Sequence, residues 1–209
     1  MTERIVIADG DADTASIAAF ERDRRELLRR GFALGGAAIA ASSVSLLLSV
    51  RNAFAQATGD AAILERSIQL ENLSVLTYET VIAGDLLSPA LARTARRLRD
   101  HEREHAQTLT TALTDLGGTA PAPAKGVAEI DEVAEGLGDV KTRADVLNFA
   151  IELETAAVAA YHEAHGKLIE ARLLQTVASI MANEGQHLVV LRMAAGQDPV
   201  PNAFETGAS

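Results

Sequence analysis

The sequence predicts an all-α protein, an antiparallel four-helix bundle in which a long crossover joins two helical hairpins. Three observations predict this fold class. Ala and Leu dominate over β-branched and aromatic residues, which favours helix over sheet. Between residues 61 and 195, four stretches carry apolar residues three and four positions apart, as one face of a helix does. Turn residues separate these stretches, and the chain carries no strand signal.

The first two helices are expected to form a hairpin. The first apolar stripe ends at Gly84. The second begins with Ser88 and Pro89, a cap residue followed by proline at the first helical position, and Gly117 ends it. Because the turn between the two helices is short, we expect them to pack antiparallel.

A linker and a second hairpin follow. The linker of about two dozen residues begins at Thr119, contains Pro and Gly, and is long enough to cross the length of a bundle. The third stripe runs from Leu147 to His165, and the fourth from Leu173 to Leu191. A short turn again joins them, which predicts a second antiparallel pair.

The two hairpins repeat one another in sequence. Each first helix carries a glutamate with a tyrosine seven residues later, and each second helix carries Glu-x-x-His. An internal repeat of this kind concerns the whole fold, because each hairpin buries its apolar face against the other. The matching positions are Glu71 with Glu154, Tyr78 with Tyr161, Glu102 with Glu184, and His105 with His187.

The repeated acidic residues interrupt stripes that are otherwise apolar. Burying an ionised carboxylate costs several kcal/mol, so four of them need compensating charge. Two divalent cations would neutralise them, and a Glu and a His three positions apart on a helix can reach the same ion. The candidate metal ligands are therefore Glu71, Glu102, His105, Glu154, Glu184 and His187.

This constellation resembles the ferritin-like superfamily, the di-iron carboxylate four-helix bundles whose core is shared by bacterioferritin and rubrerythrin. The resemblance covers about 135 residues, from 61 to 195. It implies a centre of two iron ions, or manganese ions as the alternative. It also implies that Glu102 and Glu184 bridge the ions, while His105 and His187 each cap one.

The two tyrosines strengthen the resemblance. Ferritins and bacterioferritins often carry a tyrosine seven residues after the helix glutamate, and Tyr78 and Tyr161, the only tyrosines of the chain, both hold that spacing. By this resemblance they are hydrogen-bond donors that orient the carboxylates. The absence of cysteine excludes the cysteine-ligated iron domain of a full rubrerythrin.

The resemblance implies an oxidoreductase of the ferroxidase or peroxidase type, which oxidises Fe(II) or reduces peroxide or oxygen. Three alternatives stay open at this point. A manganese pair could disproportionate peroxide, a cage could store iron, or a non-enzymatic envelope protein could hold metal for stability alone. The short segment after the fourth helix argues against a large cage, and the sequence leaves smaller homo-oligomers open.

The first 55 residues are expected to be an export signal. The run Arg24-Arg25-Glu26-Leu27-Leu28-Arg29 resembles the twin-arginine motif, with Asp23 where Ser or Thr is commoner. An apolar run and small residues before the expected cleavage after Ala55 complete the pattern. Residues 56–200 would form the helical domain and 201–209 a short tail.

The destination and partners follow from this signal and from the charge. Export would place the protein in the periplasm, the cell envelope or outside the cell. If the apolar run stays uncleaved, it would tether the chain to a membrane; the run could instead be an amphipathic helix of the folded protein. The formal net charge of −10 argues against nucleic acid or an anionic membrane surface as partner. Metal ions with oxygen or peroxide are the expected partners.

Three further residues near the motifs are assigned from helical periodicity alone. His101 and Glu104 flank the ligands of the second helix but point away from its apolar stripe, so we expect both to be solvated. His165 lies on the third stripe, and we expect it to be a buried histidine of the core.

Overall fold

The computed structural model of the chain describes residues 49–50, 52–129, 136–138 and 140–207. In this part of the chain all regular secondary structure is helical, which confirms the all-α prediction. The twin-arginine-like motif lies in the first 48 residues, outside the described range. Among the helices that are described, none combines the length and the apolar composition needed to cross a membrane.

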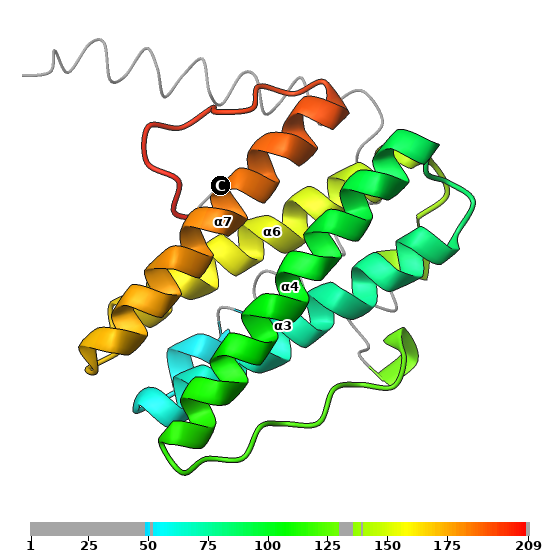
Figure 1. The fold of residues 1–209 in the computed structure, drawn as a ribbon. Helices are drawn as coiled ribbons and strands as arrows, with labels where there is room; N and C mark the ends of the chain where they lie inside the picture. Colours follow the sequence, from blue (N-terminus) through cyan, green and yellow to red (C-terminus); the bar gives the residue numbers. More distant parts are fainter. Residues whose placement is uncertain (1–48, 51, 130–135, 139, 208–209) are drawn as a thin grey trace, which may run out of the picture. The chain divides into compact units, whose positions relative to one another are not determined.

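The first hairpin consists of α3 (Asp60–Ala83) and α4 (Pro89–Asp115), which pack side by side (Figure 1). Helix α3 begins after Gly59, whose φ of 81° lies in the left-handed region that glycine tolerates. Helix α4 begins after Ser88, whose hydroxyl oxygen accepts a hydrogen bond from the backbone N–H of Leu91. Both the Ser88 cap and the proline that follows it are as predicted from the sequence.

The second hairpin consists of α6 (Arg143–His165) and α7 (Ala171–Ala195), which also lie against each other (Figure 1). A capping box starts α6, because the Thr142 hydroxyl accepts from the N–H of Asp145 and the Asp145 carboxylate accepts from the N–H of Thr142. Helix α7 ends at Gly196 in the left-handed conformation, with a φ of 72°.

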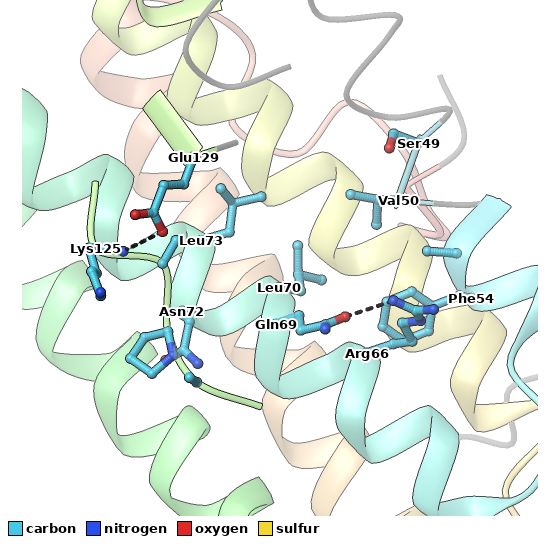
Figure 2. A pocket seen from close by; sticks show the side chains of 14 residues that line it. Ser49, Val50, Phe54, Arg66, Gln69, Leu70, Asn72, Leu73, Lys125 and Glu129 are labelled. Atoms are coloured by element: carbon cyan, nitrogen blue, oxygen red, sulfur yellow. Dashed lines mark hydrogen bonds between the residues drawn. The ribbon is translucent and has the colours of Figure 1, made fainter. Parts of the chain in front are cut away.

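The linker between the hairpins contains a short 3₁₀ helix, η1 (Val127–Glu129), which contacts α3. A cavity of about 560 Å³ lies between this part of the linker, α3 and the segment just before it (Figure 2). Leu70 and Leu73 of α3 form part of its apolar wall, and Arg66 stands on the same helix. None of the six candidate ligands lines this cavity.

The apolar core consists of two clusters of buried side chains. Along α4, Leu98 belongs to the smaller cluster and Leu109 to the larger one, and Glu102 lies between them. The same change of cluster occurs along α7 on either side of Glu184. The acidic residues therefore occupy a layer with apolar side chains on both sides, which limits the access of water to them.

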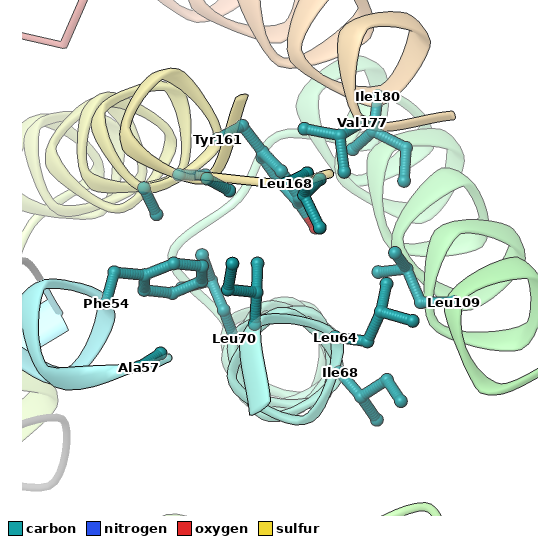
Figure 3. Packing of buried hydrophobic residues seen from close by; sticks show 14 of the residues in the cluster. Phe54, Ala57, Leu64, Ile68, Leu70, Leu109, Tyr161, Leu168, Val177 and Ile180 are labelled. Atoms are coloured by element: carbon teal, nitrogen blue, oxygen red, sulfur yellow. The ribbon is translucent and has the colours of Figure 1, made fainter. Parts of the chain in front are cut away.

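The segment before α3 belongs to the core. Phe54 is 2% exposed, and Figure 3 shows its ring directed into the larger cluster towards Leu70. The ammonium group of Lys167, in the turn between α6 and α7, donates to the backbone carbonyls of Phe54 and Ala55, both at 2.9 Å. The folded domain thus includes residues on the N-terminal side of the expected cleavage after Ala55.

Asp60 makes a second set of contacts at the same end of the domain. Its carboxylate accepts hydrogen bonds of 3.0 Å from the backbone N–H groups of Ile169 and Glu170. Glu170 makes no side-chain cap for α7. Asp60 therefore satisfies backbone donors at the start of α7 from the first residue of α3, and so links the two hairpins.

Candidate metal centre

Each of the four long helices contributes one glutamate to a buried cluster. Glu71 of α3 and Glu102 of α4 are each 1% exposed, and Glu154 of α6 and Glu184 of α7 are 0% exposed. Carboxylates are seldom buried this completely without a partner. The four acids are brought together because each lies on the apolar stripe of its own helix, and the four stripes face one another.

His105 of α4 brings an imidazole nitrogen to three of these carboxylates. Its Nδ1 lies 3.0 Å from Glu184 Oε1, 3.4 Å from Glu102 Oε2 and 3.5 Å from Glu71 Oε2. The atoms of these four residues come close enough together to hold one metal ion. We call this group the first half-site: Glu71, Glu102, His105 and Glu184.

His187 of α7 makes the corresponding arrangement with the other hairpin. Its Nδ1 lies 3.0 Å from Glu184 Oε2, 3.1 Å from Glu102 Oε1 and 3.5 Å from Glu154 Oε1. These residues also converge closely enough to hold one ion. We call this group the second half-site: Glu102, Glu154, Glu184 and His187.

Glu102 and Glu184 belong to both half-sites. Each directs one carboxylate oxygen towards His105 and the other towards His187. This division is the geometry that a bridging carboxylate needs, since each of its oxygens then faces a different ion. The internal repeat thus leads to a cluster with near two-fold symmetry.

Several potential metal-ligand atoms of the cluster are buried without a hydrogen bond, which fits a pair of cations. The Nδ1 atoms of both histidines are buried and make no well-aligned hydrogen bond, although carboxylates surround them. The same holds for both oxygens of Glu184 and for one oxygen each of Glu102 and Glu154. Buried polar atoms are rarely left unpaired, and oxygen and imidazole donors of this kind suit iron or manganese.

The two tyrosines connect the hairpins through the acids. Tyr78 of α3 donates to Oε1 of Glu154 in α6, and Tyr161 of α6 donates to Oε1 of Glu71 in α3. Each tyrosine therefore contacts the glutamate of the opposite hairpin. Burial raises the pKa of both phenols, and the charge of the adjacent glutamate raises it further. Both groups remain protonated donors at neutral pH.

Burial and mutual repulsion change the proton affinity of the acids. Burial raises the pKa of Glu102 well above its ordinary value, and the charge of Glu154 adds to this rise. The same two causes raise the pKa of Glu184 to about 7. Glu154 differs, because His187 and Tyr78 outweigh the effect of burial and lower its pKa. Protons on Glu102 and Glu184 thus reduce the repulsion between the acids when no cation is bound.

The two histidines are strong bases in this cluster. Burial opposes the charged form of His105, but contacts with Glu102, Glu184 and Glu71 outweigh it and raise its pKa to about 12. The pKa of His187 is also raised, against the effect of burial, chiefly by Glu154. A metal ion that bound to these nitrogens would have to displace the protons.

His101 is a residue of the site that periodicity missed. The prediction of a solvated side chain is wrong, because His101 is only partly exposed and its Nδ1 lies 3.0 Å from Nε2 of His187. The two rings stack, with centroids 5.3 Å apart. A cation at Nδ1 of His187 would leave the proton of that ring on Nε2, which would then donate to Nδ1 of His101. The sequence signal was a third histidine immediately before Glu102, at a position that faces α7 only in the packed bundle.

The other assignments near the motifs have mixed outcomes. Glu104 is exposed, as predicted. The prediction that His165 is a core histidine is wrong, since its side chain is exposed. His165 lies on the apolar stripe of α6, but it is the last residue of that helix, where the turn to α7 begins.

Comparison with known proteins gives one match. A family model described as the ferritin-like domain matches residues 59–197. This range begins just before α3 and ends just after α7, so it contains all four long helices and the six candidate ligands. No curated protein and no solved structure matches the chain.

Proposed function

The chain belongs to the ferritin-like domain family, and from this premise we propose that the four glutamates and two histidines of the buried cluster bind two metal ions and that the protein oxidises Fe(II) or reduces peroxide or oxygen. Glu102 and Glu184, which belong to both half-sites, would hold both ions. His105 and Glu71 complete one ion's ligands, and His187 and Glu154 complete the other's.

The main support for the proposal is that Glu102 and Glu184 each have one oxygen near His105 and the other near His187. In a metal-free layer of protonated acids, six buried oxygen and nitrogen atoms without hydrogen bonds would only lower the stability of the fold. A pair of divalent cations satisfies these atoms and neutralises the four carboxylates together. The proposal therefore explains both the burial and the unpaired atoms.

A pair of iron ions held by these residues would supply two electrons to dioxygen or peroxide. With peroxide as oxidant, two ferrous ions, one hydrogen peroxide and two protons yield two ferric ions and two water molecules. The chain's own residues set the conditions for this reaction. Tyr78 and Tyr161 hold Glu154 and Glu71 in fixed orientations, and the apolar clusters on both sides limit the entry of water.

Manganese is the alternative metal, and with it the protein would disproportionate peroxide. The donor set of carboxylate oxygens and imidazole nitrogens accepts either metal. Metal analysis of the protein purified from its own host distinguishes them. An iron content near two per chain supports the iron proposal, and a manganese content near two supports the alternative.

A non-enzymatic role is the second candidate, favoured by how completely the acids are enclosed. All four glutamates are at most 1% exposed, as suits a metal held for structure alone. In that case Glu184→Ala would lose metal and unfold more easily, while the parent protein would show no redox turnover. The location proposed for either role is outside the cytoplasm, supported by the twin-arginine-like run that ends at Arg29.

The test of the redox proposal is stopped-flow oxidation of Fe(II). The full chain is loaded with two equivalents of Fe(II) without oxygen and mixed with dioxygen or hydrogen peroxide, while ferric absorbance is recorded. We expect oxidation well above the rate in buffer for the parent and for Glu65→Ala, which changes an exposed acid of α3. Glu184→Ala should fall to the buffer rate. Parent protein that oxidises Fe(II) no faster than buffer would refute the activity.

A further inference from the structure

The structure distinguishes the two half-sites. We propose that the metal ion of the first half-site exchanges with solvent through a groove between α4 and α7, whereas the ion of the second half-site is retained. This inference rests on the proposed metal pair and assigns different roles to its two ions: the first half-site takes up the substrate Fe(II), and the second keeps a resident ion. Once oxidised, the resident ion regains its electron from a further substrate Fe(II) that enters the first half-site and leaves as Fe(III).

Exposure is the first difference between the half-sites. The side chain of His105 is 12% exposed, whereas that of His187 is 2% exposed. The four glutamates are at most 1% exposed. Of the six candidate ligands, His105 alone therefore has appreciable contact with solvent, so an ion at the first half-site is closer to the surface than its neighbour.

A groove leads to His105 from the surface. A cavity of about 400 Å³ between α4 and α7 includes His105 among its lining residues. Five of its other six lining residues have polar side chains whose oxygen atoms can contact a hydrated cation, and Glu104 adds a negative charge. The ligands found only in the second half-site, Glu154 and His187, do not line it. The polar lining residues are Glu104, Thr108, Gln175, Thr176 and Ser179.

The support behind each imidazole is the second difference. Nε2 of His187 lies 3.0 Å from Nδ1 of His101, and the two stacked rings fix the orientation of His187. The internal repeat aligns His101 of α4 with Asn183 of α7, so the other half of the chain lacks this histidine. Among the described residues, none makes a hydrogen bond to Nε2 of His105. His105 is therefore held less firmly than His187.

Orientation of a ligating histidine affects how tightly it holds a metal. A partner on the far nitrogen fixes the tautomer and the ring angle, and its loss costs 10–100-fold in metal affinity in typical sites, to order of magnitude. The His101 contact therefore strengthens the second half-site, while the groove gives the first half-site a short path to water. Both differences act in the same direction. The second half-site should bind more tightly and release more slowly.

The experiment measures binding and release of Co(II), a redox-stable substitute for Fe(II), by the metal-free full chain. Titration followed by visible absorption and calorimetry should show two binding steps of different affinity. Mixing the loaded protein with excess chelator in a stopped-flow instrument should then show a fast and a slow phase of similar amplitude. The fast phase reports the first half-site and the slow phase the second.

Two variants connect each phase with its structural cause. His101→Ala should weaken the tight step about 10–100-fold and accelerate the slow phase, leaving the other step unchanged. Its matched control is His165→Ala, at an exposed histidine. Ser179→Leu narrows the groove at an exposed position and should slow the fast phase several-fold without changing either affinity. Its matched control is Thr80→Leu, an exposed hydroxyl on α3 that likewise donates to the carbonyl four residues earlier.

The outcomes separate this inference from the proposed function. Two Co(II) ions that bind with one affinity and leave in one phase would refute the difference between the half-sites while supporting the metal pair. Acceleration of the fast phase by His101→Ala, or an unchanged fast phase in Ser179→Leu, would also overturn the inference. A chain that binds no Co(II) at all would refute both. The two steps and the two separate variant effects would support it.

Discussion

Tyr161 of α6 donates its hydroxyl hydrogen bond to Glu71 of α3, which lies 90 positions earlier in the chain. Tyr78 makes the equivalent bond to Glu154 in the reverse direction. Both phenols are fully buried, and both bonds cross from one hairpin to the other. The same two contacts therefore orient the acids and join the halves of the bundle, so the candidate metal centre and the fold depend on the same atoms.

The first prediction concerns these crossed hydrogen bonds. Tyr161→Phe leaves a buried oxygen of Glu71 without its donor, and we expect the metal-free protein to lose about 1–3 kcal/mol of unfolding free energy. Urea unfolding of the metal-free protein measures the loss. Tyr78→Phe should give a loss of similar size, because it removes the symmetric contact with Glu154. Unchanged stability in both variants would show that these bonds do not hold the hairpins together.

The second prediction concerns pH and the metal-free protein. Folding raises the pKa of Glu184 from 4.5 to about 7 and that of His105 from 6.5 to about 12. Both groups favour the folded state in their protonated forms. The stability due to Glu184 is complete below about pH 4.5 and is lost as the pH rises through about 7. The stability due to His105 is complete below about pH 6.5 and declines as the pH rises above that value.

Metal-free protein should therefore become less stable between about pH 5 and pH 8, by an amount on the order of a few kcal/mol. Urea unfolding at several pH values measures this slope. Glu154 acts in the opposite sense, since its lowered pKa gives stability that is lost only at acidic pH. The amide introduced by Glu184→Gln does not titrate, so the unfolding free energy of this variant should decrease less with pH than that of the parent. A stability that stays level or increases over this interval would contradict the prediction.

The third prediction concerns added metal. Mn(II) at about 100 times its dissociation constant should raise the unfolding free energy by about 2.7 kcal/mol for each occupied site, because it binds only the folded state. Thermal unfolding with and without Mn(II) measures the shift, and a chelator should reverse it. Binding should also release protons into a weakly buffered solution, since the imidazoles and the acids give them up. Glu184→Ala should lose most of both effects, and Glu65→Ala should keep them.

The fourth prediction concerns the start of the folded domain. Phe54→Ala should lower the unfolding free energy by about 3–5 kcal/mol, because it removes a ring that is 2% exposed in the larger cluster. Phe204→Ala is the matched control, since that ring is 87% exposed, and it should change stability by less than about 0.5 kcal/mol. Urea unfolding compares the two variants.

The same contacts bear on the expected cleavage after Ala55. Cleavage after Ala55 would separate Phe54 from the domain and would remove the two carbonyls that Lys167 contacts. Mass spectrometry of the protein purified from its host gives the N-terminal residue. A mature chain that begins at residue 56 would have to be less stable than the chain that keeps Phe54.

Much of this protein was predictable from local sequence patterns. The spacing of apolar residues located the four helices, and Ser88 with Pro89 located the start of α4. The Thr142 capping box was equally readable in the sequence, yet periodicity alone did not point to it. The four glutamates among the candidate ligands could be identified because an acid on an apolar stripe is costly to bury, whichever helix lies opposite. The two histidines could be identified because each lies three positions after one of these glutamates on the same helix face.

The contacts between helices could not be predicted in the same way. Tyr78 lies on the same helix face as Glu71 but donates to Glu154, and His101 faces away from its own stripe but reaches His187. Each of these contacts depends on the rotation and spacing of packed helices. Helical periodicity fixes the direction of a side chain relative to its own axis and contains no information on the neighbouring axis.

The sequence by itself determined which residues lie on the inner faces of the helices and which chemistry they offer, because both follow from a period of 3.6 residues and from the cost of burying charge. Only the tertiary structure decided how the two halves differ. The groove at His105 and the His101 contact behind His187 arise where α4 packs against α7. A repeated sequence therefore produces two half-sites with the same acids and different surroundings.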